Sequence, residues 1–145
     1  MSFINANTAN PTNSSQIGYT IQTQPFTSST YNSSTIYYIY DTYVIPKGMW
    51  LITASVLLTN NTTNSLSTTN VRIAFPGNTY GKNVIVNSVS SGSSGYVGLS
   101  SYVGEPYYSD GTNSCGIYFN AVTSDSNPYN LAGGTNSTMT YVKIA

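Results

Sequence analysis

The side chains that most often carry catalysis are scarce in this chain of 145 residues. It contains no histidine, which excludes histidine-containing catalytic triads and histidine-ligated metal sites. The four carboxylates lie far apart in the sequence, at Asp41, Glu105, Asp110 and Asp125. Nothing about their positions indicates the pair of carboxylates that glycoside hydrolysis requires. We therefore expect that the protein is not an enzyme and that it binds no cofactor.

Two neighbouring segments carry groups that could hold a ligand. Asp110-Gly111-Thr112-Asn113 offers oxygen atoms that suit Ca²⁺, but Asp followed by Gly is also typical of a tight turn. We favour the turn and expect no metal. Tyr107 and Tyr108 could stack on a sugar ring, yet exposed tyrosines fit a subunit interface equally well, since tyrosine is enriched there. We take both as candidate interface residues.

Charged residues make up only 6% of the chain, with four basic and four acidic residues and no net charge. Typical soluble domains contain about 25% charged residues. Nucleic acid is not an expected partner, because its binding depends on basic groups that neutralise phosphates. A surface with so few charges also lacks the repulsion that keeps copies of a protein apart. This composition favours a protein that packs against copies of itself or against partners.

The ends of the chain and its single cysteine limit the class of protein further. No run approaches the ~18 apolar residues of a membrane span, and the first residues do not resemble a secretion signal, so we expect no membrane insertion. Cys115 cannot form an internal disulfide, and its apolar surroundings predict a small buried hydrophobic side chain. Residues 1–15 lack periodicity. They are either a frayed terminus or an N-terminal arm that orders against a neighbour through Phe3 and Ile4.

The elements that would position any site are strands, because Thr, Tyr, Val and Ile dominate the sequence. The strongest pattern runs from Tyr43 to Asn60, with a turn at Pro46-Lys47-Gly48. Its second half alternates, so that one face of an extended strand carries Trp50, Ile52, Ala54, Val56 and Leu58. We predict that Trp50, Ile52, Val56 and Leu58 form the centre of the core. A ligand platform at Trp50 is the alternative.

About eight strands are predicted in a single domain of residues 16–145. Besides residues 49–59, strand patterns cover residues 17–23, 36–45, 71–75, 83–89, 96–103, 115–122 and 137–145. Loops or links are predicted for residues 24–34, 60–70, 90–95, 104–113 and 125–136. The number of strands favours an all-β jelly roll, a sandwich of two antiparallel sheets. An immunoglobulin-like sandwich is the alternative, but its Cys…Trp…Cys signature is absent.

Two segments together resemble a known group of proteins. The first is Ile-Pro-x-Gly-x-aromatic-x-Ile, which begins here at Ile45 and includes Trp50, and the second is the closing strand Thr138-Met-Thr-Tyr-Val-Lys-Ile-Ala145. This pattern is similar to single jelly-roll virion proteins and to TNF/C1q-like β-sandwich heads. The bias toward Ser, Thr, Asn and Tyr in one small domain resembles the penton or vertex capsid proteins of large icosahedral DNA viruses.

The resemblance implies a structural role without catalytic residues. It implies a capsid subunit of the virion, made in the host cytoplasm, that forms a homo-oligomer, a pentamer rather than a trimer, and contacts neighbouring major and minor capsid proteins. The alternative is a trimeric TNF/C1q-like fibre or spike head that binds a host receptor or glycan. We expect contacts between subunits to use residues 104–113 and 125–136 with their flanking strands.

Overall fold

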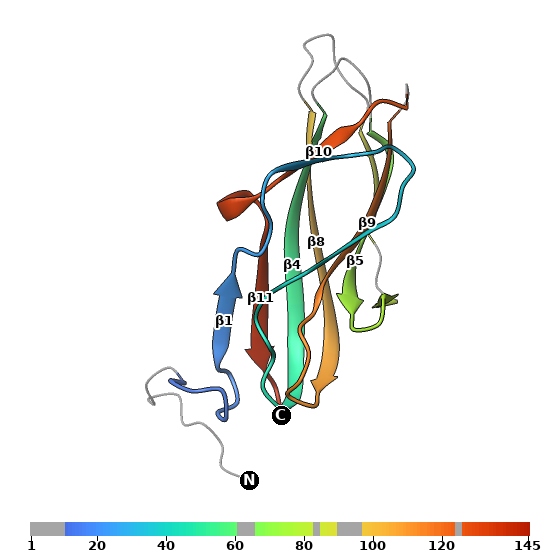
Figure 1. The fold of residues 1–145 in the computed structure, drawn as a ribbon. Coiled ribbons are helices and arrows are strands. Elements are labelled where there is room, and N and C mark those ends of the chain that lie inside the picture. The colour runs from blue at the N-terminus through green and yellow to red at the C-terminus, as the bar shows by residue number, and fades with distance from the viewer. Residues whose placement is uncertain (1–10, 61–65, 83–84, 90–96, 124–125) are drawn as a thin grey trace.

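The computed structural model describes residues 11–60, 66–82, 85–89, 97–123 and 126–145. These residues form two antiparallel sheets packed against each other, which confirms the predicted all-β sandwich (Figure 1). Within this part of the chain, the one helical element is a single turn of 3-10 helix, Gly134–Asn136.

Sheet A is built around one long strand. Its strands are β1 (Thr20–Thr23), β11 (Thr138–Lys143), β4 (Gly48–Asn60), β8 (Val97–Ser109), β10 (Tyr129–Ala132) and β2 (Ser29–Tyr31). On one side, β4 pairs with β8 over all 13 residues of both strands. On its other side, β4 pairs first with β11 and then with β10, and these two strands lead on to β1 and β2. Every other strand of sheet A is therefore placed by β4.

Sheet B covers the buried face of sheet A. It contains β3 (Tyr37–Tyr40), β9 (Gly116–Thr123), β5 (Leu66–Phe75), β6 (Thr79–Tyr80) and β7 (Ile85–Val89). β9 lies between β3 and β5, and both β6 and β7 pair with β5. Four of the strand pairs are nested in the sequence: β1 with β11, β3 with β9, β4 with β8, and β5 with β7. The chain thus folds back on itself as one antiparallel ribbon divided between two sheets.

The core lies between the sheets, on the inner face of β4. Trp50, Ile52, Val56 and Leu58 are all fully buried. Sheet B supplies the opposite wall with Val71, Ile73, Ile117 and Phe119. The indole nitrogen of Trp50 donates a hydrogen bond to the carbonyl of Pro46 at 2.8 Å, so its polar atom is satisfied. Cys115 is a buried free thiol in the same cluster, and burial raises its pKa to about 12, which keeps it neutral.

Two buried charged groups hold the strands near Trp50 together. Asp41 accepts hydrogen bonds from the hydroxyls of Tyr141, at 2.7 Å, and Thr23, and from the amide of Tyr43 at 3.1 Å. It therefore links β1, β11 and the segment that follows β3. Lys143 points inward, where its ammonium donates to the carbonyl of Lys47 at 2.9 Å and lies 5.3 Å from the Trp50 ring. Buried charges need such partners, and here hydroxyls, carbonyls and a ring supply them.

Several predicted loops are in fact paired strands. The loop predicted for residues 60–70 is wrong from residue 66 onward, where β5 begins and pairs with β9. The loop predicted for residues 104–113 is wrong as far as residue 109, because β8 follows β4 along its full length. Pro106 is tolerated there because the described residues place β8 at the edge of sheet A, where proline needs no donor.

The remaining differences involve short strands. The link predicted for residues 24–34 contains β2, and the loop predicted for residues 125–136 contains β10, which pairs with both β2 and β4. The strand predicted for residues 36–45 ends at Tyr40, and the strand predicted for residues 17–23 begins at Thr20. Residues 90–95 lie outside the described residues.

Burial of Trp50 gives the first prediction. The substitution Trp50→Ala should lower the free energy of unfolding by about 3–5 kcal/mol, the usual cost of removing a buried aromatic side chain. The matched control is Ser55→Ala on the same strand, because alternation directs Ser55 to the opposite face, away from the core. Its cost should stay below about 1 kcal/mol in denaturant melts. Equal costs for both variants would contradict the assignment of the two faces of β4.

The tyrosines give a prediction about alkaline pH. Burial raises the pKa above the ordinary value of 10.0 for Tyr31, Tyr40, Tyr43, Tyr107, Tyr118, Tyr129 and Tyr141. In the unfolded chain these phenols ionise at lower pH than in the folded protein. Stability is therefore complete below the unfolded pKa and falls as the pH rises above it.

We expect melting temperatures to decrease from about pH 10 upward, where unfolded tyrosine ionises. Absorbance of tyrosinate should rise together with unfolding. Tyr129→Phe, which removes a buried phenol, should make the decrease shallower. Melting temperatures that stay constant through pH 11 would contradict this account.

Candidate interaction surface

The outer face of sheet A carries exposed apolar side chains at one end. Alternation directs Met49, Leu51, Thr53, Ser55 and Leu57 of β4 away from the core. The register places Val142 of β11 and Pro106 of β8 on either side of Leu51. It also places Tyr108 opposite Met49, and a hydrogen bond of 2.9 Å from the amide of Ile144 to the carbonyl of Met49 brings Ile144 to this end.

These side chains form one surface, which we call the apolar patch. It consists of Met49, Leu51, Pro106, Tyr108, Val142 and Ile144. The exposed fractions are 57% for Tyr108, 41% for Ile144 and 37% for Leu51. Ile17, 54% exposed, lies close by, because the adjacent Gly18 amide donates to the carbonyl of Lys143 at 2.7 Å. A cluster of exposed apolar side chains of this kind indicates an interaction site.

Charged residues are absent from the outer face of sheet A in the described part of the chain. Lys143 and Glu105, although on β11 and β8, alternate to the inner side of the sheet opposite Trp50 and Ile52. Lys47 and Asp110 lie in exposed turns beside the patch. An apolar centre with charges confined to its rim is the usual arrangement of a protein interface.

The patch depends on a glycine at the start of β4. Gly48 has φ +132°, a conformation that other residues rarely adopt. A Cβ atom on Gly48 would lie 1.6 Å from the Lys143 ammonium and 2.9 Å from the carbonyl of Ala145. The amide of Met49 also donates to the Ala145 carbonyl at 2.8 Å. Because residue 48 has no side chain, the end of the chain after β11 can lie against the start of β4. This packing holds Val142 and Ile144 in place.

The two tyrosines predicted at an interface point in opposite directions. Tyr107 faces the interior and stacks on Phe75, with 5.0 Å between ring centroids and 13° between ring planes. Tyr108 is exposed within the apolar patch. Phe3 and Ile4, the other two candidates, lie outside the described residues. Met49, Leu51, Val142 and Ile144 were not predicted as surface residues, although apolar residues on both faces of these strands indicate such a surface.

The tyrosines near β3 pack within the molecule. Tyr37 stacks on Phe119 at 5.6 Å, and Tyr43 contacts the ring of Tyr141 at 5.1 Å. On the outer face of sheet B, Tyr38 contacts Tyr118 edge to face at 5.4 Å. The guanidinium of Arg72 lies 4.8 Å from the ring of Tyr80 and 5.9 Å from that of Tyr118. The outer face of sheet B thus differs from that of sheet A in carrying a cation among aromatic rings.

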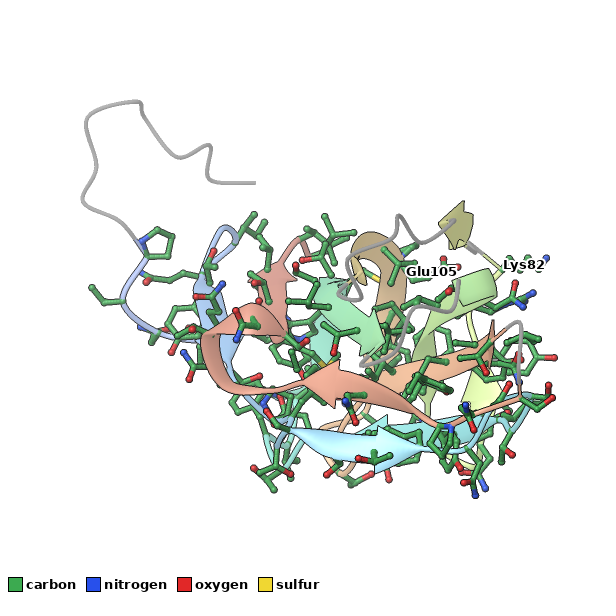
Figure 2. The ribbon with its side chains drawn as sticks, turned by 90° about the horizontal axis from the view of Figure 1, so that it is seen from above. Lys82 and Glu105 are labelled. Carbon is green, nitrogen blue, oxygen red and sulfur yellow. The ribbon has the colours of Figure 1, made fainter. Side chains whose placement is uncertain are left out.

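Two further charged residues lie at an edge of the sandwich. Figure 2 shows Lys82 and Glu105 near each other on the same side of the molecule. Glu105 packs against the backbone of Gly81, the residue before Lys82. A Cβ atom on Gly81 would lie 2.5 Å from a carboxylate oxygen of Glu105, so glycine makes this contact possible. Glu105, opposite the inward-facing Ile52, is directed away from the outer face of sheet A.

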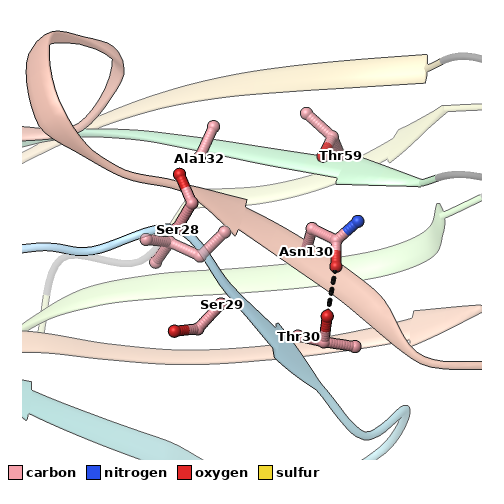
Figure 3. A pocket seen from close by; sticks show the side chains of 7 residues that line it. Ser28, Ser29, Thr30, Thr59, Asn130 and Ala132 are labelled. Carbon is pink, nitrogen blue, oxygen red and sulfur yellow. Dashed lines mark hydrogen bonds between the residues drawn. The ribbon is translucent and has the colours of Figure 1, made fainter.

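The other end of that outer face contains a hollow of about 280 Å³, lined by Ser28, Ser29, Thr30, Thr59, Asn130, Leu131 and Ala132 (Figure 3). The hydroxyl of Thr30 donates to the amide oxygen of Asn130 at 2.7 Å. None of the described residues that line the hollow is charged, and hydroxyl and amide groups provide its polarity. It lies where β2 and β10 extend sheet A beyond the end of β11.

The described residues provide no cluster of three or more metal-ligating side chains. Asp110 belongs to a local turn, in which its carboxylate accepts the hydroxyl of Thr112 at 2.6 Å and the amide of the same residue at 2.9 Å. These hydrogen bonds lower the pKa of Asp110. Within the same part of the chain, no helix has the length and apolar character needed to cross a membrane.

No protein-family model matches the chain, and no curated protein matches its sequence.

Gly48 gives a prediction about the end of the patch. Gly48→Ala should destabilise the protein by about 1–3 kcal/mol, because alanine is strained at this φ and its Cβ atom displaces Lys143. Gly77→Ala is the matched control, since Gly77 also has positive φ, +78°, but a Cβ atom there meets nothing within 4 Å. It should cost about 1 kcal/mol. A smaller cost in thermal melts for Gly48→Ala than for Gly77→Ala would contradict the proposed anchoring.

Proposed function

We propose that this protein is a structural subunit of a virion capsid, of the single jelly-roll penton or vertex type. Copies would associate around a symmetry axis, as a pentamer, and contact neighbouring major and minor capsid proteins. The observation that carries the proposal is the apolar patch on an outer sheet face without described charges. A structural role needs contact surfaces and no reacting groups, and the patch is such a surface.

The nested strand pairing supports the jelly-roll part of the proposal. A jelly roll divides eight principal strands between two antiparallel sheets. Here β1, β11, β4 and β8 lie in one sheet, while β3, β9, β5 and β7 lie in the other. The pairs β1·β11, β3·β9, β4·β8 and β5·β7 are those of an antiparallel ribbon rolled into a sandwich. In this view, β2, β6 and β10 are short additions.

We propose a second copy of the chain as the occupant of the apolar patch. The chain has no net charge, so two copies do not repel each other as they approach. The tyrosine and aliphatic side chains of the patch suit a contact formed by apolar burial and hydrogen bonds. In a closed ring, the patch of each copy would contact a different surface of the next copy, because a ring repeats one heterologous interface.

A trimeric fibre or spike head that binds a glycan is the second candidate. The hydroxyl-lined hollow favours it, because such a head needs a polar recognition site in addition to its subunit contacts. The two candidates differ in the number of copies. Five copies in the native assembly would support the vertex role, and three would support the fibre head.

The test of self-association is the native mass of the purified protein and of two variants. The wild-type protein should form a closed oligomer whose mass changes little with ionic strength, because its contact involves few charges. Leu51→Asp should convert it to monomers, since a carboxylate in the middle of the patch would lose its water on association. Gln22→Glu is the control: it adds the same charge at an exposed position on β1 outside the patch and should still assemble.

Both variants should still fold and unfold cooperatively, because residues 51 and 22 point away from the core, and Leu51→Asp should lose only the stabilisation that association adds. A wild-type monomer at all concentrations and salt conditions would contradict self-driven assembly. An oligomer that survives Leu51→Asp, or one that dissociates as salt increases, would place the contact elsewhere.

A further inference from the structure

We propose that the hollow at the β2–β10 end of sheet A binds a neutral polyhydroxylated ligand, namely one sugar unit of a glycan. This site is separate from the apolar patch, and the inference does not depend on the proposed assembly. The patch centres on residues 49–51 of β4 and the hollow on residue 59, so about 25–30 Å of extended strand lies between them. The two surfaces can therefore be tested independently.

A row of polar side chains forms one wall of the hollow. Strand register places Asn130 of β10 opposite Thr30 of β2 on one side and opposite Thr59 of β4 on the other. Side chains directly opposite each other on neighbouring strands share one face of a sheet. Three polar groups are thus aligned across three strands whose residues come from distant parts of the sequence.

Small side chains leave the space beside this row empty. Ala132 lies opposite Leu57, two residues along β10 from Asn130, so it occupies the same face. Neither Ala132 nor Ser28, which also lines the hollow, can fill the volume of about 280 Å³. Ligand pockets for larger molecules usually start near 300 Å³. The hollow therefore suits a single sugar ring rather than a larger compound.

Internal hydrogen bonds fix the groups that would contact a ligand. The Asn130 amide oxygen accepts the hydroxyl of Thr30 at 2.7 Å, and Figure 3 shows the amide nitrogen turned away from Thr30. The Ser28 hydroxyl oxygen accepts the amide of Gly133 at 3.0 Å, which leaves its own hydrogen for donation. Orienting these groups before binding reduces the entropy that a ligand contact would cost.

The chemistry of the lining selects a neutral ligand. An anion or a cation would lose its water without gaining an opposite charge from the described residues that line the hollow, because none of them is charged. Hydroxyl and amide groups both donate and accept, which matches the adjacent hydroxyls of a sugar. The seven described lining residues include no aromatic ring for stacking, so we expect dissociation constants in the millimolar range, about 1 mM or weaker.

Saturation-transfer NMR on the full chain tests the site, because it detects weak ligands on proteins of any oligomeric state. The probes are glucose, galactose, mannose and N-acetylglucosamine, with glucuronic acid as the charged comparison. At least one neutral sugar should receive saturation from the wild-type protein and show a saturable titration, while glucuronic acid should receive less.

Three variants locate the binding site. Ala132→Leu should abolish the transfer by filling the hollow. Asn130→Ala should weaken binding about tenfold through the lost hydrogen bond. Thr140→Leu is the matched control, because it places the same side chain on the outer face of β11, away from the hollow, and should bind as wild type does. Melting temperatures establish that each variant is folded, and Asn130→Ala decides the matter if Ala132→Leu does not fold.

Two results would overturn the proposal. One is the absence of saturation transfer to every neutral sugar at concentrations of about 100 mM, far above the expected dissociation constants. The other is transfer that is unchanged in the folded hollow variants, which would place binding elsewhere. Neither result bears on the capsid proposal, which is decided by the native mass and by Leu51→Asp.

Discussion

The structure depends first on the burial of one face of β4. Its inner row, from Trp50 to Leu58, is the part of the core on which sheet B closes. Burying an aromatic or large aliphatic side chain contributes about 1.5–3 kcal/mol each, more than the roughly 0.5–1.5 kcal/mol of a typical hydrogen bond between neutral groups. Because β4 also pairs along both edges, its placement fixes β8, β11 and β10 at once. Because β4 is held in this position, the side chains on its opposite face necessarily point outward from sheet A.

That opposite face explains why this protein has an apolar surface at all. A strand inside a sheet whose outer side meets water normally carries polar residues there. β4 does so at Thr53 and Ser55 but not at Met49 and Leu51, and β11 places Val142 beside them. The few charges of the chain do not compensate, because Asp41 and Lys143 are engaged in holding β1 and β11 to the core. The apolar patch therefore results from the apolar residues that β4 and β11 carry on their outer face. It is not a part of the core that packing has left exposed.

Local sequence pattern predicted the sandwich and the buried row of β4, because alternation within one strand is a local property. It failed for β10 and for the second half of β8, where Pro and Gly suggest loops but pairing with β4 imposes strand. The two candidate sites were harder to predict for the same reason. Met49 and Val142 meet only through the β4–β11 register, and Thr30 meets Asn130 across 100 residues of sequence. Such register depends on non-local pairing, which periodicity does not contain.

Low charge also determines how this face can recognise a partner. Charged surfaces steer their partners into contact and reach association rates near 10⁸–10⁹ M⁻¹ s⁻¹, whereas neutral surfaces associate at about 10⁵–10⁶ M⁻¹ s⁻¹. The outer face of sheet A, with an apolar end and a hydroxyl-lined end, belongs to the second kind in its described part. The affinity of contacts formed there must come from a low dissociation rate. Apolar burial, or several hydrogen bonds acting together, would lower that rate. Such contacts would suit the proposed capsid subunit, which would meet the same neighbours at high local concentration and select them by shape and by many weak contacts.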